Sequence, residues 1–256
     1  MITVIITACG PSQTLRHTLN CARASIYGVS KLIVADAQPC TENKDTCAFH
    51  FAEYHPRKRD GFAANANYLL SRVETKYALL LGNDVMLLPN TISELISNYS
   101  ENTVAQPIVL DTTPVKRPAS KVGYTNMMSG NCTLIPVQFM RENGIKFNES
   151  LFSYGEDTQF GFDWISHGGY ILQLDNCYAV HDHRGYYNTT PAARKYYYLA
   201  RNSLIVAELY PKQWGKMGTM IALGLLVMKP KHLFDTLAGI RDFLLGRHGP
   251  HPDHKL

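Results

Sequence analysis

Leu79-Leu80-Leu81-Gly82-Asn83-Asp84-Val85 is an apolar run that ends abruptly in a single carboxylate. Residues 77–81 are apolar at every position and predict a strand buried on both faces, as in the parallel sheets of α/β proteins. Asp84, with Asn83 beside it, would then emerge at the carboxyl edge of the sheet, where open α/β sheets bind ligands. A lone aspartate after a strand is weak evidence for a site, so other parts of the chain must supply its companions.

The first hundred residues alternate between strand and helix patterns. Strands are predicted at residues 2–7, 31–35, 48–55 and 77–81, and helices at 12–25, 61–72 and 89–99. This alternation predicts an α/β domain with a mainly parallel central sheet. Further strands at 103–110, 127–135, 170–174 and 177–181, and helices at 156–166 and 191–209, extend the domain to about residue 210.

The C-terminal part of the chain has a different character. Residues 217–228 are apolar on all sides but number about a dozen, short of the roughly 20 that a bilayer-spanning helix needs. Residues 233–245 follow an amphipathic pattern with an apolar stripe on one helical face. Two interpretations stay open: helices packed on the core, or an interfacial pair lying on a membrane, helped by Lys216, Lys229 and Lys231. The expected organisation is a domain at 1–210, a helical appendage at 211–246 and a disordered tail at 247–256.

Composition and charge exclude several function classes. Of the 256 residues, 45% are hydrophobic and 18% charged, which is ordinary for a globular protein with a sizeable core. The formal charge of +4 is too small and too diffuse to indicate a nucleic-acid partner. The six cysteines are scattered without a C-x-x-C pair, which argues against a zinc site and a disulfide framework. The first residues lack the features of a secretion signal, so we expect a reduced, cytoplasmic setting.

Two sets of carboxylates follow predicted elements in positions that suit a ligand. Asp36 ends the second predicted strand, where a carboxylate is a recurrent contact for a nucleoside; the alternative is a structural turn. Glu156 and Asp157 open an amphipathic helix. One interpretation is that they only stabilise the helix, by interacting with the positive end of its dipole. The other is catalytic, because a sugar transfer with inversion needs one carboxylate to take the proton from the attacking hydroxyl. Asp157, ahead of a buried helix, is the candidate for that base.

Histidine follows another predicted strand. His181 comes directly after residues 177–180, and His183 lies two positions further on. Imidazole is a common metal ligand, so His181, with His183 as second choice, could complete a site with Asp84 and a diphosphate. The alternative is a pair of surface histidines. The glycine spacing at residues 61–67 fits neither the dinucleotide fingerprint nor the P-loop, which excludes those two enzyme classes.

The order of these motifs resembles the inverting family 2 glycosyltransferases, which have a nucleotide-sugar-binding GT-A fold, and within them the rhamnosyltransferase and galactofuranosyltransferase-like branch. The resemblance covers about residues 2–210. Each matching segment is loose by itself, and the specificity comes from seven of them in the right order. They are residues 4–7, 33–36, 61–67, 80–85, 154–157, 179–181 and 197–202.

The resemblance implies a role for each matching donor-binding position. Thr7 and Asp36 would hold the nucleoside, and Asn67 would lie near the base or ribose. Asp84, with Asn83 next to it, would bind Mn²⁺ or Mg²⁺ on the diphosphate of the donor.

Further positions would hold the metal and carry out the transfer. His181 would be a protein ligand of the metal, Asp157 the base, and Glu156 a contact to the acceptor. Arg201 would face the phosphates or the acceptor. The implied reaction moves a sugar from a UDP- or dTDP-sugar to a hydroxyl of a bacterial surface glycan on a lipid carrier. The enzyme would work in the cytoplasm, at the inner face of the cell membrane.

One position departs from the family pattern. Gly82 stands where the complete metal-binding element has a first acid, which implies weaker metal binding rather than loss of function. It also keeps open a non-catalytic binding protein on a degenerate GT-A fold. A sugar-nucleotide pyrophosphorylase is a second alternative, but residues 9–11 lack the glycine-rich, basic loop that such an enzyme needs after its first strand.

Overall fold

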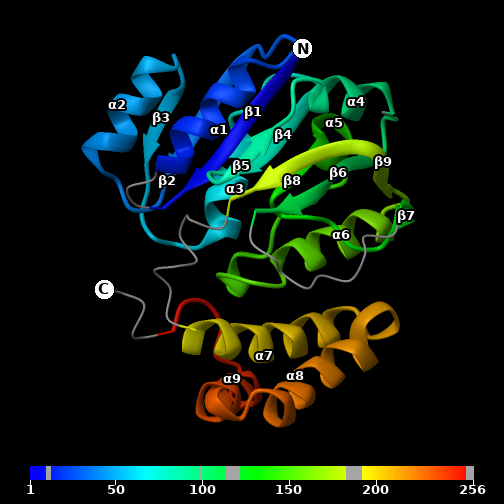
Figure 1. Cartoon of the computed structure of the whole chain (residues 1–256). Coiled ribbons are helices and arrows are strands. Elements are labelled where there is room, and N and C mark those ends of the chain that lie inside the picture. The colour runs from blue at the N-terminus through cyan, green and yellow to red at the C-terminus, as the bar shows by residue number, and fades with distance from the viewer. Residues whose placement is uncertain (10–12, 99, 113–121, 183–191, 252–256) are drawn as a thin grey trace.

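The computed structural model describes residues 1–9, 13–98, 100–112, 122–182 and 192–251. Its strands form one sheet in the order β3-β2-β1-β4-β8-β6-β9-β5, with β7 also paired to β9 (Figure 1). The strands are β1 (Ile2–Ala8), β2 (Lys31–Asp36), β3 (Glu53–Pro56), β4 (Tyr77–Gly82), β5 (Val85–Leu87), β6 (Thr103–Asp111), β7 (Gly123–Thr125), β8 (Cys132–Pro136) and β9 (Tyr170–His181). The helices of the sheet domain are α1 (Gln13–Arg23), α2 (Thr41–Phe49), α3 (Phe62–Ser71), α4 (Thr91–Ser97), α5 (Val137–Glu142) and α6 (Glu156–Ser166).

The N-terminal half of the sheet is parallel, as the alternation of strands and helices predicts. Strands β3, β2, β1 and β4 run in the same direction. Strand β8 then lies antiparallel between β4 and β6, so the sheet as a whole is mixed. Three strand predictions change in detail. The strand predicted at 127–135 is β8, which begins only at Cys132. Helix α2 occupies the start of the segment predicted as a strand at 48–55, and β9 is one continuous strand instead of the two predicted at 170–181.

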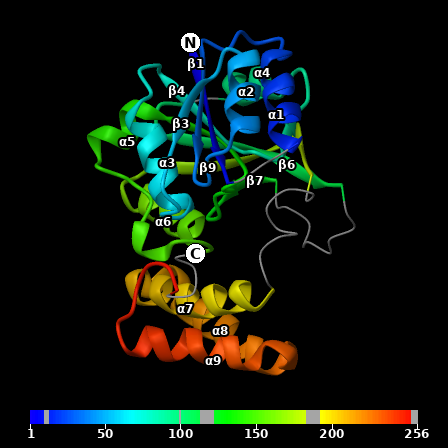
Figure 2. The ribbon, with the colours of Figure 1, turned by 90° about the vertical axis from the view of Figure 1, so that its left-hand side faces the viewer.

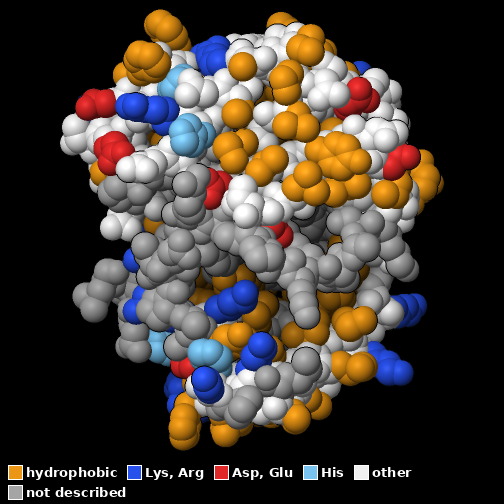
Figure 3. Space-filling view, in the orientation of Figure 1, with side chains coloured by type: hydrophobic (Ala, Val, Ile, Leu, Met, Phe, Trp, Pro, Cys, Tyr) orange, Lys and Arg blue, Asp and Glu red, His pale blue; other side chains and the backbone are white. Residues whose placement is uncertain are grey.

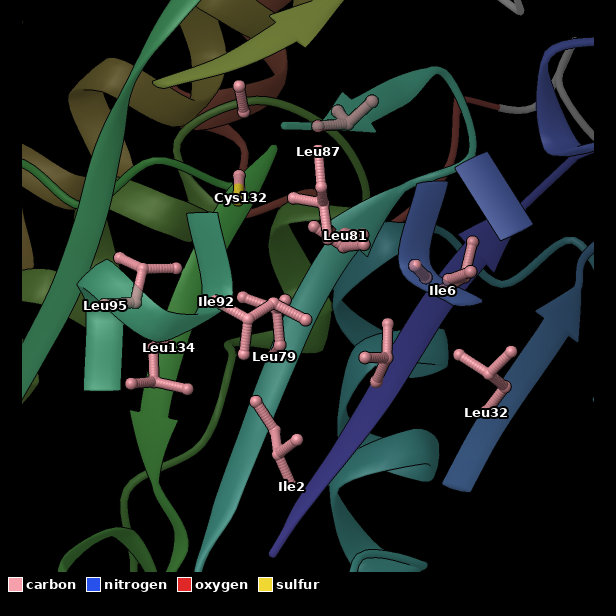
Figure 4. Packing of buried hydrophobic residues seen from close by; sticks show 14 of the residues in the cluster. Ile2, Ile6, Leu32, Leu79, Leu81, Leu87, Ile92, Leu95, Cys132 and Leu134 are labelled. Carbon is pink, nitrogen blue, oxygen red and sulfur yellow. The ribbon is translucent and has the colours of Figure 1, made fainter. Parts of the chain in front are cut away.

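Apolar side chains alternate between the two faces of the sheet because successive strand residues point in opposite directions. Leu79 and Leu81 pack with α1 and α4 on one face, and Figure 4 shows them among Ile6, Ile92 and Leu95. Leu80 packs on the opposite face with residues of α3 and α6. Both faces are covered and β4 lies between β1 and β8, so β4 is a central strand of the sheet.

Helices α7 (Ala192–Leu209), α8 (Lys216–Met228) and α9 (Leu233–Leu244) form a helical unit below the sheet domain (Figures 1 and 2). Helices α7 and α9 cross at Gly239, where a Cβ atom would lie only 2.3 Å from the backbone oxygen of Tyr197. A helical C-terminal region is therefore present, and it begins with α7, which was predicted as part of the domain at 1–210. In the described ranges no helix is both long and apolar enough to cross a membrane.

The predicted disordered tail differs from the structure over its first five residues. Residues 247–251 lie against the helical unit: the backbone nitrogen of Gly249 donates to the oxygen of Ser150 at 2.7 Å, and that of His251 donates to the hydroxyl of Tyr198 at 2.8 Å. Glycine and proline prevent a helix here, but they leave these backbone groups available for such contacts. Residues 252–256 lie outside the described residues.

Candidate active site

A cavity of about 510 Å³ opens at the carboxyl ends of the central strands, between the sheet domain and the helical unit. Figure 3 shows acidic side chains above this waist of the molecule and basic side chains below it. Strand β1 contributes a residue because its pairing with β4 sets Thr7 opposite Gly82. Six of the residues predicted from the sequence line the cavity: Thr7, Asn83, Asp84, Glu156, Asp157 and His181.

Strand pairing brings Asp84 and His181 together. Strand β5 begins directly after Asp84 and pairs with the end of β9, so that Val85 lies opposite His181. Oδ2 of Asp84 then lies 3.2 Å from Nε2 of His181, and both side chains are buried. The sequence predicted this proximity, and it follows from two strand ends meeting at one edge of the sheet.

Asp111 is a neighbour of His181 that the sequence analysis missed. It ends β6, which runs parallel to β9 and sets Asp111 opposite His181. Oδ1 of Asp111 lies 3.4 Å from Nδ1 of the imidazole, on the opposite side of the ring from Asp84. The signal that could have revealed it is the same as for Asp84, a carboxylate at the end of an apolar strand.

The two residues Asp84 and His181 fit a divalent metal ion as a partial ligand set. A carboxylate and an imidazole can both bind Mn²⁺. Nε2 of His181 faces Asp84, while Nδ1 of the same ring faces Asp111. The described residues contain no group of three or more His, Cys, Asp or Glu side chains arranged for a metal, so a bound diphosphate and water would have to complete the coordination. Gly82 contributes space: a Cβ atom there would lie 3.0 Å from Oδ1 of Asp84.

Glu156 and Asp157 are the first two residues of α6, and Glu156 is buried while Asp157 is half-buried. Oδ1 of Asp157 accepts a hydrogen bond of 2.7 Å from the backbone nitrogen of Thr158. Burial raises the pKa of Asp157, and the backbone groups of Thr158 and Gly130 partly oppose that rise. Burial, and then the charge of Asp157, raises the pKa of Glu156 to about 8. Burial and the negative charge of Asp157 therefore favour the protonated form of Glu156 near neutral pH.

Cationic side chains line the same cavity. Arg59 reaches it from the loop before α3, and Arg194 and Lys195 reach it from the first turn of α7. The sequence analysis assigned no role to them, because nothing local in the sequence sets the start of α7 beside the sheet edge. Their charges suit the phosphates of a nucleotide.

Two predicted donor-binding residues do not reach the cavity. Asp36 is fully buried, and its carboxylate accepts hydrogen bonds from the side chains of Asn43 at 2.8 Å and Tyr54 at 3.0 Å. It organises the turn after β2, and its neighbour Ala37 lines the cavity instead. Asn67 lies on the outer side of α3, where its side chain both donates to and accepts from the backbone of Phe147.

Arg201, which was predicted to face the phosphates or the acceptor, does not line the cavity. It is buried within the helical unit, with its guanidinium 5.2 Å and 5.0 Å from the ring centroids of Tyr197 and Tyr198. Its Nη1 donates to the backbone oxygen of Gly249 at 2.7 Å. The next residue, Asn202, lines the cavity in its place. His183, the second-choice metal ligand, lies outside the described residues.

Comparison with known proteins settles the fold. No family model and no curated protein sequence matches the chain. Among solved structures, TarS from S. aureus in complex with UDP-GlcNAc matches 96% of this chain and 81% of its own, with a TM-score of 0.67 and 14% identity. The mannosyltransferase PcManGT from Pyrobaculum calidifontis, in complex with GDP-Man and Mn²⁺, matches 96% of this chain and 87% of its own, with a TM-score of 0.66 and 14% identity.

The chain has the GT-A fold. GalNAc-T7 with UDP, GalNAc and Mn²⁺ matches 96% of this chain and 56% of its own, with a TM-score of 0.65 and 13% identity. A longer structure of TarS from S. aureus also matches, and the present chain spans only 42% of its length. At these identities the likeness establishes the fold, and the chemistry has to be argued from the side chains in the cavity.

Proposed function

We propose that this chain is an inverting glycosyltransferase that moves a sugar from a nucleotide-sugar, UDP- or dTDP-linked, to a hydroxyl group of an acceptor. One observation carries the proposal. One cavity at the carboxyl edge of a GT-A sheet is lined by both the Asp84–His181 pair and the Glu156–Asp157 pair. The first pair suits a metal-bound diphosphate, and the second suits removal of a proton from a hydroxyl.

The donor end of the cavity would neutralise the leaving diphosphate. Asp84 and His181 would hold a Mn²⁺ or Mg²⁺ ion, which supplies positive charge to the diphosphate oxygens when bound. Asp111, on the far side of the imidazole, would keep Nε2 of His181 directed at the ion, as outer carboxylates do for metal-bound histidines. Arg59 and Lys195 add charge at the same cavity. The presence of Mn²⁺ in the structures of PcManGT and GalNAc-T7 supports this arrangement.

Asp157 would act as the base at the acceptor end. The acceptor hydroxyl gives its proton to the Asp157 carboxylate while its oxygen attacks the anomeric carbon from the face opposite the diphosphate. The bond between that carbon and the phosphate oxygen breaks, the diphosphate leaves with the electron pair, and the anomeric centre inverts. Glu156 keeps its proton near neutral pH, because its pKa is about 8, and so can donate a hydrogen bond to a sugar hydroxyl.

The acceptor, in this proposal, is a bacterial surface glycan on a lipid carrier, and the enzyme is peripheral to the inner face of the membrane. Support comes from an apolar face on the helical unit, made of residues whose side chains are 45–85% exposed: Met217, Met220, Leu223, Val227, Phe234, Leu237 and Leu244. Positions three or four apart place these residues on one stripe of α8 and one of α9. The exposed Lys216, Lys229 and Lys231 flank the face, which suits an anionic lipid surface.

The sequence left two interpretations of these helices, and each describes one side of them. Ala222 and Gly239 face inward and pack within the helical unit. The apolar face points outward, and orange side chains at the lower edge of the molecule lie beside blue ones in Figure 3. Packing on the core explains the inward side only, so the outward side supports membrane attachment.

Release of nucleoside diphosphate from a donor panel tests the proposed function. The panel contains UDP-, dTDP- and GDP-sugars with Mn²⁺, and includes GDP because PcManGT was solved with GDP-Man. We expect release with one nucleotide class, and strong loss in Asp157→Asn. A non-catalytic binding protein would bind a donor without turnover. A pyrophosphorylase would instead form a nucleotide-sugar from a nucleoside triphosphate and a sugar phosphate.

A further inference from the structure

We infer that Asn202 of α7 is a positioning residue for the Glu156–Asp157 pair, so that the helical unit is part of the catalytic site. The inference rests on the proposed function and concerns how its carboxylates are held. The connection runs through the segment 151–155, called here the site loop, which ends directly before Glu156.

Asn202 contacts the backbone of the site loop through its side-chain amide. Its side-chain nitrogen Nδ2 lies within hydrogen-bond distance of three backbone oxygens of the loop, those of Leu151 at 2.6 Å, Ser153 at 2.8 Å and Tyr154 at 2.7 Å. Asn202 is buried, and a Cβ atom on Gly155 would lie 3.5 Å from its own Cβ. One buried amide therefore determines the path of the chain up to the residue that precedes the carboxyl pair.

The site loop needs such a support because its backbone is unusual. Phe152 has a φ of 53° and Tyr154 a φ of 68°, in a region that residues other than glycine rarely adopt. Gly155 follows with a φ of 88°. Such conformations persist only when the surroundings over-determine them, and they cluster at functional sites. On its opposite side the loop is fixed to the start of α3, where the nitrogen of Phe62 donates to the oxygen of Phe152 at 3.1 Å.

Arg201 fixes the orientation of the Asn202 amide. Its Nε donates to Oδ1 of Asn202 at 2.9 Å, which leaves Nδ2 directed at the site loop. Arg201 is itself held by Tyr197 and by the oxygen of Gly249, the residue whose nitrogen donates to Ser150. One continuous set of hydrogen bonds thus runs from the C-terminal segment through Arg201 and Asn202 to the site loop. Arg201 is therefore engaged by hydrogen bonds within the helical unit.

The consequence concerns turnover more than donor binding. Of the residues proposed for the donor end, Thr7, Asp84 and His181 come from the ends of β1 and β9 and from the turn between β4 and β5, which make no contact with Asn202 among the hydrogen bonds described above. The position of Asp157 does depend on it, and a displacement of about 1 Å at a reacting group can cost roughly 10²-fold in rate. Asn202→Ala should therefore lower kcat by roughly 10–100-fold and leave the dissociation constant of the donor within about twofold of the wild-type value.

Two further variants separate positioning from general destabilisation. Asn202→Asp has nearly the same shape and can pair with Arg201, but a carboxylate has no hydrogen to donate to the three loop oxygens; it should lose activity as Asn202→Ala does. Asn102→Ala is the matched control, because Nδ2 of Asn102 also joins two distant segments, donating to the oxygen of Gly168 at 3.0 Å. Asn102 does not line the cavity, and this control should keep wild-type kcat.

Hydrogen exchange followed by mass spectrometry tests the inference independently of the proposed function, without any substrate. Peptides covering residues 150–158 should lose protection in Asn202→Ala and Asn202→Asp at temperatures where both remain folded, and should keep it in Asn102→Ala. Unchanged protection there would overturn the positioning role. If protection falls but the wild-type protein turns over no donor, the loop contact stands and the proposed function fails. Wild-type kcat in Asn202→Asp would show that the donated hydrogen bonds do not set the position of Asp157.

Discussion

Nε2 of His181 lies 3.2 Å from Oδ2 of Asp84, and Nδ1 of the same ring lies 3.4 Å from Oδ1 of Asp111. Three strand ends, of β4, β6 and β9, therefore meet around one imidazole. This arrangement leaves His181 and Asp84 as a pair that a metal ion can join, with Asp111 outside it. The first two predictions concern this pair.

Asp84→Ala and His181→Ala should weaken Mn²⁺ binding in the presence of UDP, with the larger loss for Asp84, because the carboxylate supplies charge as well as a ligand. Asp111→Asn should weaken it by roughly 10–100-fold, as loss of an outer partner typically does. Calorimetric titration of Mn²⁺ measures all three. Asp235→Ala is the control and should bind normally, because it removes a half-buried carboxylate of α9 that lies outside the cavity, 3.9 Å from Nδ1 of His232. Donor binding that EDTA does not weaken would show that the site uses no metal ion.

Gly82→Asp restores the acid that the family pattern has at this position, yet it should not strengthen metal binding. A Cβ atom at position 82 would lie 3.0 Å from Oδ1 of Asp84 and 3.4 Å from Cγ2 of Val85. The new side chain would press on the existing carboxylate, so we expect equal or weaker Mn²⁺ affinity than in the wild-type protein. Gly82→Ala isolates the steric part. A clear gain in affinity for Gly82→Asp would show that the site has room for a second carboxylate.

Asp157→Asn should abolish transfer and leave donor binding nearly intact, because the base acts on the acceptor. Loss of a general base typically costs roughly 10²–10⁴-fold in rate. Turnover gives the rate, and titration with the donor gives the dissociation constant. Wild-type turnover in this variant would place the base elsewhere, and Glu156 would be the first residue to test.

Glu156 predicts a pH dependence of stability with a defined sign. Its pKa in the folded protein is about 8, against an ordinary 4.5, so the folded state holds this proton more tightly than the unfolded chain does. The resulting stability is fully present below about pH 4.5 and is lost as the pH rises to about 8. Glutamine does not ionise, so Glu156→Gln should not lose this stability as the pH rises. The Tm of this variant relative to the wild type should rise between pH 5 and pH 8.5.

The expected size is at least ~1 kcal/mol, from a shift of more than one pKa unit, or about 2–4 °C in Tm for a chain of this length. Thermal melts at the two pH values measure it. Glu142→Gln is the control, since Glu142 is exposed on α5 and accepts a hydrogen bond of 2.7 Å from Gln138. A parallel pH dependence for Glu156→Gln and the wild type would mean that Glu156 ionises normally.

The parallel half of the sheet could be predicted because it follows from local patterns. Apolar runs and helix periodicity between residues 2 and 97 suffice to identify β1, β2 and β4 as strands of a parallel sheet and to place Thr7 and Asp84 at its carboxyl edge. The position of β8 between β4 and β6 could not be predicted, since strand pairing is set by contacts between distant segments. Asp111 was missed for the same reason: its approach to His181 depends on the register of β6 with β9.

The misplaced residues show where a motif stops being informative. Arg201 and Asn202 belong to one motif, but adjacent helix residues point about 100° apart. Asn202 therefore faces the site loop, while Arg201 faces Tyr197 and the C-terminal segment. Asn67 fails similarly, because Asn65 lines the cavity and Asn67 points to the other side of α3. A motif identifies the helix, and only packing identifies the face.

The apolar face of α8 and α9 should bind anionic vesicles. Val227 and Phe234 are 82% and 85% exposed, so charges there disturb no packing. The double variant Val227→Glu/Phe234→Glu should lose most sedimentation with phosphatidylglycerol vesicles, and salt should weaken the wild-type interaction by screening the lysines. The control is Phe49→Glu on α2, because Phe49 is 78% exposed and lies far from α8 and α9 in the sequence; this variant should bind as the wild type does. Equal sedimentation of both variants would reject this surface.

Calorimetric titration with nucleotide-sugars, with and without Mn²⁺, asks whether the cavity holds a metal-bound donor. We expect one of the UDP-, dTDP- or GDP-sugars to bind with 1:1 stoichiometry in Mn²⁺. We also expect at least tenfold weaker binding in EDTA, and equally weak binding in Asp84→Ala with Mn²⁺. Absence of binding by every donor, or binding that neither EDTA nor Asp84→Ala changes, would contradict the proposed metal-bound donor.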